Sequence, residues 1–186
     1  RAAMRAEGNA ARFRSLFDHS EEGIILATPS GEILAANDAA CRLLGHDEPT
    51  LRRLGREGVV RHDHRLAETL EERDRSGHSH RELTLVRAGG ETFPAEVTAT
   101  HFRDEAGEER VSVIFRDISA RRRAESQARL AASVVDNTAE AVVVLEADGR
   151  IIWVNAAFAR ITGFDESAPP ERLSSFLEYE SDRDAA

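Results

Sequence analysis

Residues 18–48 read DHSEEGIILATPSGEILAANDAACRLLGHDE, and the chain repeats this pattern 118 residues later, over residues 136–166. The two segments align without a gap, and 10 of the 31 pairs are identical. The identical pairs are Asp18/Asp136, Glu22/Glu140, Gly31/Gly149, Ile33/Ile151, Asn37/Asn155, Ala39/Ala157, Arg42/Arg160, Gly45/Gly163, Asp47/Asp165 and Glu48/Glu166. Solenoid repeats recur every 20 to 50 residues or so, so this longer period indicates a tandem of whole domains.

The composition limits the possible classes of protein. Hydrophobic residues make up 41% and charged residues 32% of the 186, as in a globular chain, and the net charge of −9 argues against nucleic-acid binding. No apolar run approaches the roughly 20 residues of a membrane span, and no signal peptide is visible. The single cysteine, Cys41, fits a reducing compartment, so we expect a cytoplasmic protein. The chain starts at Arg1 rather than Met, which suggests a piece of a longer protein.

The order of predicted elements indicates an α+β fold. They are a helix over 2–17, a hairpin over 23–36, a helix from 37 to 45, loops and short helical turns over 48–64, a helix over 65–76, and strands over 80–86, 92–102 and 110–116. The helices rest on apolar spacings of three and four residues, and the strands rest on alternation of apolar and polar residues. A hairpin, then helices, then three consecutive strands predict an antiparallel sheet with the helices on one face.

A second helix is predicted after Ser119, where the chain is polar, rich in Ala and free of Gly and Pro. Ala124, Ala128, Ala131 and Val135 recur at spacings of four, three and four, which is the spacing of a heptad seam. Such a seam could pair with the same helix of another chain. Ala side chains bury little area, so this seam alone would give weak pairing.

These motifs resemble those of PAS domains, the sensory modules of many bacterial signalling proteins. In the first copy, Ala11 to Ser119, the resemblance is carried by Phe17-Asp18-His19-Ser20, Glu22-Gly23-Ile24, Gly31-Glu32-Ile33, Asn37-Asp38-Ala39-Ala40, Gly45, Gly90 to Val97 and Arg116-Asp117-Ile118-Ser119. In the second copy it is carried by Val135 to Thr138, Glu140-Ala141-Val142, Asp148 to Ile151, Val154 to Phe158 and Ile161 to Phe164. The order, spacing and repetition of these motifs make the resemblance specific.

The resemblance implies a five-stranded antiparallel sheet with helices over one face, followed by a linker helix and a partial second PAS domain. The implied parts are a lead-in helix at 1–11, a complete PAS domain at 12–118, a helical linker at 119–135 and a truncated second PAS domain at 136–186. The truncated copy would hold only its first hairpin and helices, and we expect it to be loosely ordered or to rest on another surface.

The resemblance also implies a signal relay at Asp117, Ile118 and Ser119, where the last strand leads into the linker helix. Asp117 and Ser119 have a chemical role independent of the family. Their short side chains carry oxygen at a helix start, where they can accept hydrogen bonds from free backbone N–H groups.

An apolar pocket is predicted between the inner face of the strands and the helix over 65–76. Its candidate lining is Leu66, Leu70, Leu83, Leu85, Val97, Ala99, Val113 and Phe115. Alternating apolar residues usually pack against one another, so a filled core without ligand is the favoured interpretation. A small apolar ligand in this space is the alternative.

No metal or haem is predicted. His62, His64, His78 and His80 form two His-x-His pairs, but they lie among polar residues at predicted loop ends, which favours solvated histidines. Haem-binding PAS domains usually supply an axial His from or near the long helix, and residues 65–75 contain none. The sequence therefore departs from the haem-binding pattern.

A flavin is not predicted either. Light-sensing PAS domains carry their reactive cysteine later in the chain, in an Asn-Cys-Arg motif that is absent here. Cys41 lies in the helix after the hairpin, which favours a core thiol, and the first copy has neither Trp nor Tyr to stack on a flavin.

The resemblance implies a sensory module, and we expect it to lack catalytic activity because the chain has no catalytic motif and no phosphate-binding loop. Residues 131–140, AASVVDNTAE, resemble segments of cyclic-di-GMP enzymes of the GGDEF/EAL type. Such an output domain is the favoured expectation, and a histidine kinase is next. The expected partners are a second copy of the chain, through PAS and helical segments, and the output domain. No nucleic acid and no membrane are expected for this fragment. A purely structural dimerisation module is the alternative.

Overall fold

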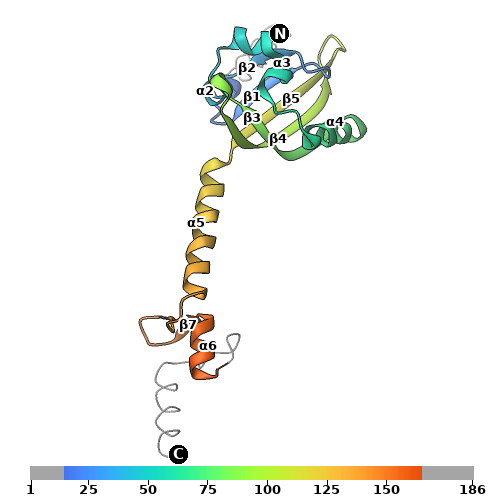
Figure 1. Cartoon of the computed structure of the whole chain (residues 1–186). Helices are drawn as coiled ribbons and strands as arrows, with labels where there is room; N and C mark the ends of the chain where they lie inside the picture. Colours follow the sequence, from blue (N-terminus) through green and yellow to red (C-terminus); the bar gives the residue numbers. More distant parts are fainter. Residues whose placement is uncertain (1–14, 165–186) are drawn as a thin grey trace, which may run out of the picture. The chain divides into compact units, whose positions relative to one another are not determined.

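The computed structural model describes residues 15–164, which belong to two compact units, 15–121 and 122–164 (Figure 1). The first unit contains β1 (Gly23–Ala27), β2 (Ile33–Ala36), α2 (Asp38–Leu44), α3 (Glu48–Val59), α4 (His64–Ser76), β3 (His78–Val86), the 3-10 helix η1 (Ala88–Gly90), β4 (Thr92–Arg103) and β5 (Glu109–Asp117). Helix α5 (Ser119–Asp136) follows β5. The predicted helix over 2–17 lies mostly outside the described residues.

The five strands of the first unit form one antiparallel sheet in the order β2-β1-β5-β4-β3. Strands β1 and β4 present alternate residues to the core, as strand geometry predicts. In β4 the buried positions are Phe93, Ala95, Val97 and Ala99, which are the apolar positions of the predicted alternation. The predicted α+β fold with a five-stranded antiparallel sheet is therefore confirmed.

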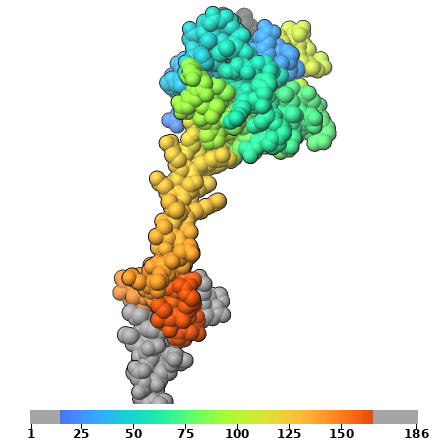
Figure 2. Space-filling view, viewed as in Figure 1, coloured from blue at the N-terminus to red at the C-terminus, as the bar shows by residue number. Residues whose placement is uncertain are grey.

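The core lies between this sheet and helices α2, α3 and α4, and the blue-green to green atoms of α3 and α4 form a continuous surface in Figure 2. Loops and short turns were predicted where α3 forms. Its start is stabilised by Asp47, whose side chain accepts from Thr50 N at 2.9 Å. The predicted irregularity occurs at Gly55, where φ is 60° and ψ is −170° and α3 divides into two helical segments, and at residues 60–63, which form no helix. Helix α4 closely matches its predicted range.

The buried side chain of Asn37, 1% exposed, joins three segments of the first unit. Its Nδ2 donates to the carbonyl oxygens of Phe17 at 2.9 Å and Glu22 at 3.0 Å. Its Oδ1 accepts from the backbone N–H groups of Ile24 at 2.9 Å and Ala40 at 2.8 Å. One amide thus caps α2 and ties the chain before β1 to the sheet.

The described part of the second unit contains a hairpin and one helix after α5: β6 (Val143–Leu145), β7 (Ile151–Val154) and α6 (Ala156–Thr162). Ile151, Val154 and Phe158 form its small core, with Val143 and Phe164 packed against them. The predicted opening of a second copy is confirmed over these residues. Residues 165–186 of that copy lie outside the described part of the chain.

The repeat extends to individual hydrogen bonds. Asn155 Nδ2 donates to the carbonyl oxygens of Val135 at 2.9 Å and Glu140 at 3.0 Å. Asn155 Oδ1 accepts from Val142 N at 2.9 Å and Phe158 N at 3.0 Å. All five residues follow their counterparts around Asn37 by 118 positions, so the two copies open with the same hydrogen-bonded frame.

Helix α5 has no buried residue along its 18 positions. Ala124, Ala128 and Ala131 are exposed, and Val135 is half-buried. Among the helices described between residues 15 and 164, none has the length and apolar character needed to cross a membrane.

Candidate functional site

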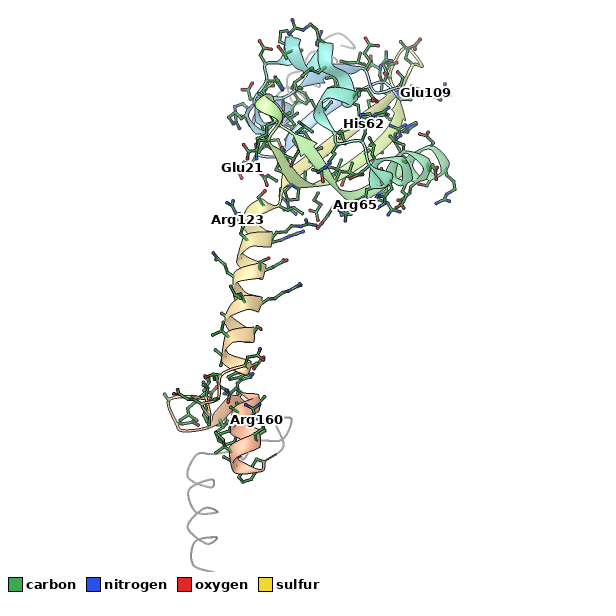
Figure 3. The ribbon with its side chains drawn as sticks, viewed as in Figure 1. Glu21, His62, Arg65, Glu109, Arg123 and Arg160 are labelled. Atoms are coloured by element: carbon green, nitrogen blue, oxygen red, sulfur yellow. The ribbon has the colours of Figure 1, made fainter. Side chains whose placement is uncertain are left out.

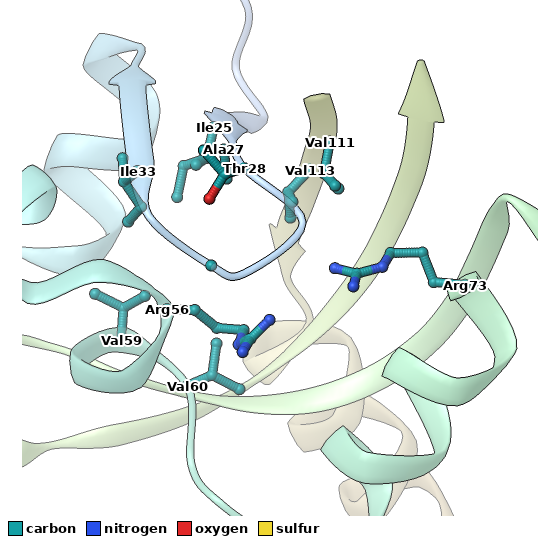
Figure 4. A pocket seen from close by; sticks show the side chains of 11 residues that line it. Ile25, Ala27, Thr28, Ile33, Arg56, Val59, Val60, Arg73, Val111 and Val113 are labelled. Atoms are coloured by element: carbon teal, nitrogen blue, oxygen red, sulfur yellow. The ribbon is translucent and has the colours of Figure 1, made fainter. Parts of the chain in front are cut away.

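The first unit contains a small apolar cavity of about 70 Å³, beside the turn between β1 and β2 (Figure 4). The cavity is lined by Ile25, Ala27, Thr28, Gly31, Ile33, Arg56, Val59, Val60, Arg73, Val111 and Val113. Strands β1, β2 and β5 supply most of the apolar wall, while α3 and α4 contribute the two arginines. The cavity therefore combines an aliphatic wall with two guanidinium groups.

Of the predicted pocket residues, Val113 alone lines this cavity. Leu66, Leu83, Leu85, Val97 and Phe115 belong to the main core cluster, and Leu70 and Val113 pack against it. Ala99 is buried. Leu66 and Leu70 also border an open surface hollow beside His62. Seven of the eight predicted residues thus belong to one core or pack against it, and the cavity is displaced toward the β1–β2 turn.

Arg56 and Arg73 both hold the β1–β2 turn. Arg73 in α4 is 6% exposed, and its Nη2 donates to Pro29 O at 3.2 Å. Arg56 in α3 donates from Nη2 to Ser30 O at 3.1 Å. Sequence reasoning missed both residues. For Arg73 a signal existed, because it follows Leu66 and Leu70 at positions i+7 and i+3 and so shares the buried face of α4.

A close backbone approach brings the turn against α3. Gly31 O accepts from Arg56 N at 2.8 Å. Gly31 has φ of +102°, and a Cβ there would lie 2.9 Å from Arg56 Cζ. A Cβ at Gly55 would lie 3.2 Å from Gly31 O. Two glycines therefore make room for the contact that closes this side of the cavity.

The predicted relay residues lie at the junction of β5 and α5. Asp117 Oδ1 accepts from Ser119 N at 2.8 Å, which caps the start of the helix. Asp117 Oδ2 lies 2.6 Å from Arg87 Nη2. Ile118, 2% exposed, donates from its backbone N to Pro94 O at 3.1 Å. The junction is thus attached to the sheet through side-chain and backbone contacts.

Arg87 connects the junction to the rest of the first unit. Its guanidinium carbon lies 3.9 Å from the centre of the Phe93 ring, in a cation–π contact. Its Nη1 donates to Leu43 O in the last turn of α2. Since Asp117 accepts from the same guanidinium, Arg87 joins α2, β4 and the end of β5. The sequence analysis did not identify Arg87.

A second set of charges holds the first turn of α5 to the outer face of the sheet. Arg121 Nη2 lies 3.2 Å from Glu82 Oε1, and Arg121 Nη1 lies 3.8 Å from Glu96 Oε1. Glu96 Oε2 also lies 2.5 Å from Arg116 Nη2. The hydrogen bond from Arg116 lowers the pKa of Glu96, assisted by the nearby positive charges. These surface pairs each contribute little to the stability of the fold.

The pKa of Asp117 is shifted by opposing effects. Burial raises it, but hydrogen bonds from Ser119 and Arg87 and the charge of Arg87 together hold the pKa below its ordinary value. A depressed folded pKa contributes stability above the unfolded pKa, and that contribution is lost as pH falls through the folded value. Deprotonated Asp117 therefore stabilises the junction at neutral pH.

We expect the Asp117→Asn variant to be less stable than wild type at about pH 6, and we expect the difference to narrow as the pH falls below about 3.9, the ordinary pKa of Asp. At low pH, protonation removes the charge of Asp117 from wild type, whereas the substitution removes that charge at every pH. Urea unfolding at about pH 6 and at about pH 3 measures the difference. If the difference in the free energy of unfolding between the two proteins stayed constant down to pH 3, the Asp117 charge would not stabilise the junction.

The four predicted loop histidines are exposed, but His78 and His80 belong to β3, which begins two residues earlier than predicted. Their Nδ1 atoms lie 3.3 Å and 2.8 Å from the hydroxyls of Thr100 and Thr98, respectively. His62 lies at the surface between α3 and α4 (Figure 3), with its Nε2 2.8 Å from Glu57. Within residues 15–164, no group of three His, Cys, Asp or Glu residues could hold a metal ion.

Cys41 in α2 is half-buried and packs against the core cluster. Burial, together with nearby acidic residues, raises the pKa of its thiol. A raised pKa keeps the sulfur protonated and poorly reactive at neutral pH, in keeping with a core thiol.

Several solved structures share this fold. The PAS domain of an HTR-like protein from Haloarcula marismortui is 30% identical, with a TM-score of 0.51 over 63% of this chain and 98% of that one. A PAS domain from a two-component sensor histidine kinase is 18% identical, with a TM-score of 0.53 over 60% and 98%. An RNA-binding Light-Oxygen-Voltage receptor is 19% identical, with a TM-score of 0.52 over 67% and 37%. No curated protein matches the chain.

Two family models match the sequence. One, described as a PAS domain, matches residues 21–120, and a second of the same description matches residues 128–185. The first match spans the complete sheet with its helices, and the second includes the repeated hairpin and helix. The chain therefore belongs to the PAS domain family.

Proposed function

We propose that this chain is the sensory part of a cytoplasmic bacterial signalling protein, and that it passes the state of the first PAS domain through α5 to an output domain. One observation carries the proposal. Strand β5 contributes Val111 and Val113 to the cavity wall and ends at Asp117, which caps α5. A change at the cavity therefore has only four residues of strand to cross before it meets the helix.

The proposed relay requires that the junction can adopt two arrangements. Arg87 holds Asp117, and Arg121 holds Glu82 and Glu96. A shift of β5 relative to β4 would change both sets of distances and release or tighten the start of α5. Such a shift alters output only if the ligand or partner has different affinities for the two arrangements.

The output that we favour is a cyclic-di-GMP enzyme of the GGDEF/EAL type, supported by the resemblance of residues 131–140; a histidine kinase is next. The full-length protein discriminates between these outputs directly. Synthesis or hydrolysis of cyclic-di-GMP supports the first, and autophosphorylation from ATP supports the second.

The proposed partner is a second copy of this chain, through the PAS domain and α5. Exposure of Ala124, Ala128 and Ala131 leaves the helical seam available for pairing. The packed core around Leu83, Leu85 and Phe115 favours a second candidate function, a structural dimerisation module without ligand. The two functions differ in whether a change in the first PAS domain alters the output.

We expect Arg87→Gln to accelerate amide hydrogen exchange at the start of α5 by about tenfold, because it removes a charge-assisted hydrogen bond to Asp117. In the full-length protein the same substitution should change the output activity. Arg103→Gln is the matched control, since Arg103 is exposed and pairs with Glu109 in the β4–β5 hairpin, away from the junction. Unchanged output with Arg87→Gln would contradict the relay.

Sedimentation of the chain tests the partner. Ala128→Glu places a charge in the proposed seam, and we expect it to weaken self-association relative to wild type. An association state that is the same for both proteins would remove α5 as an interface and leave the PAS domain alone to carry any dimer.

A further inference from the structure

The cavity of the first unit is apolar on one side and cationic on the other. We propose that it binds a short-chain monocarboxylate, whose carboxylate lies between Arg56 and Arg73 and whose alkyl tail contacts the valines and isoleucines of β1, β2 and β5. This inference rests on the proposed sensory function, since it names the class of signal that the first PAS domain would detect.

The two guanidiniums approach the cavity from different helices and point toward one another (Figure 4). Each is held in place by a carbonyl of the β1–β2 turn, Pro29 for Arg73 and Ser30 for Arg56. Their orientation is therefore fixed before a ligand arrives. Two converging guanidiniums match the planar, two-oxygen geometry of a carboxylate.

Donor groups remain for a ligand. Arg56 Nε is buried and has no hydrogen-bond partner among the described residues, while Nη2 makes both of the side-chain hydrogen bonds of Arg56. Arg73 uses Nε and Nη2 for its hydrogen bonds to Asp74 and Pro29. A buried N–H without an acceptor is unfavourable, and a ligand oxygen would supply one.

The charge of the site favours an anion. The residues that line the cavity include two arginines and no Asp or Glu. The acidic partners of the arginines, Glu57 and Asp74, have side chains that are 63% and 61% exposed, so water screens their charges. A cation is therefore disfavoured in the cavity, and a neutral amide would forgo the charge-assisted hydrogen bonds.

The size and walls of the cavity limit the rest of the ligand. An apolar cavity of about 150 Å³ holds benzene, whereas this cavity has about 70 Å³. A tail of about two to four carbon atoms follows from that comparison. Phosphate and sulfate fit the arginines but would place charged oxygens against Ile33, Val59 and Val111, where an anion is poorly solvated.

Titration of the 186-residue chain with butyrate, followed by NMR of the arginine Nε–H and backbone amide signals, tests the site. We expect saturable shifts at Arg56 Nε–H and at Val111 and Val113 below about 50 mM ligand. Butyramide, which has the same shape without charge, should bind at least about tenfold more weakly. Chloride at the same ionic strength should give no saturable shift at these positions.

Arg73→Gln should weaken butyrate binding about tenfold and leave butyramide binding unchanged. Arg52→Gln is the matched control, because Arg52 is exposed on α3 and pairs with Glu48. Equal binding of butyrate and butyramide by wild type, or no saturable shift with butyrate, would overturn the proposal even if Arg73→Gln failed to fold. Butyrate binding of wild-type strength in a folded Arg73→Gln variant would also overturn it.

The same titration separates this inference from the proposed function. Butyrate binding with no shift of the α5 amides would contradict the relay and leave the carboxylate site intact. An output that responds to Arg87→Gln while butyrate does not bind would overturn the carboxylate site and leave the relay intact.

Discussion

Replacing Gly23 with Val is expected to lower the free energy of unfolding of the first unit by about 3 kcal/mol. Gly23 in β1 lies directly opposite Phe115 in β5, and a Cβ at Gly23 would lie 2.3 Å from Phe115 Cζ. Phe115 is 2% exposed and belongs to the core cluster, so displacing its ring would disturb the packing of that cluster. A glycine is thus required where the aromatic ring covers the neighbouring strand. Urea unfolding followed by the amide signals of β4 measures the effect in this unit alone.

Two further variants establish the cause. Phe115→Ala costs about 3 to 5 kcal/mol as a single change, but in the Gly23→Val background its additional cost should be smaller because the clash is gone. Ala141→Val is the matched control, since Ala141 lies 118 residues after Gly23 and is exposed. We expect it to change stability by no more than about 0.5 kcal/mol. Additive costs for Gly23→Val and Phe115→Ala would show that the ring is not the obstacle.

Asn37→Ala is expected to destabilise the first unit by about 3 kcal/mol. The substitution leaves the backbone N–H groups of Ile24 and Ala40 and the carbonyls of Phe17 and Glu22 without the partner that Asn37 provides. Loss of the cap alone accounts for about 1 kcal/mol, and the unsatisfied groups account for the rest. Urea unfolding gives the total.

The repeat supplies matched tests for Asn37. Asn155→Ala removes the same four hydrogen bonds from the second unit. It should therefore lower the stability of that unit, followed by the amide signals of β6 and β7, and leave the stability of the first unit, followed by those of β4, unchanged. Asn137→Ala is the control for an exposed asparagine, whose side chain donates to Ser133 O in the last turn of α5. A cost below about 1 kcal/mol for Asn37→Ala would mean that its amide acts only as a cap.

Most elements of the fold could be predicted because their local patterns are strong. The turn at Pro29–Gly31 and the apolar alternation in β4 can be recognised in the sequence, and the structure has both at the same residues. The short helical turns predicted over 48–64 correspond to α3, which non-helical backbone at Gly55 divides in two. Pro49, Gly55 and Gly58 lower helix propensity there, while Leu51 and Val59 pack against the core. The start of β3 was missed because His78 and His80 face outward, where polar residues give no apolar alternation.

The candidate site was harder to predict. Asn37 and Asn155 were recognised as an identical pair. Their hydrogen bonds are made to backbone N–H and C=O groups. Every residue carries such groups, so the sequence does not show which of them the asparagines would contact. Arg56 and Arg73 were missed because an arginine in a charged helix usually faces solvent. Arg87 was missed for a similar reason, since its three partners come from separate segments of the chain.

The sequence by itself determined the tandem, the antiparallel α+β fold and the position of the junction before α5, because these depend on periodicity, turn residues and element order along the chain. Only the tertiary structure decided that Phe115 lies over Gly23, that the cavity lies beside the β1–β2 turn, and that Arg56 and Arg73 converge on it. Those features depend on which residues meet across the sheet and between helices. Such contacts follow from packing in three dimensions, and no local pattern encodes them.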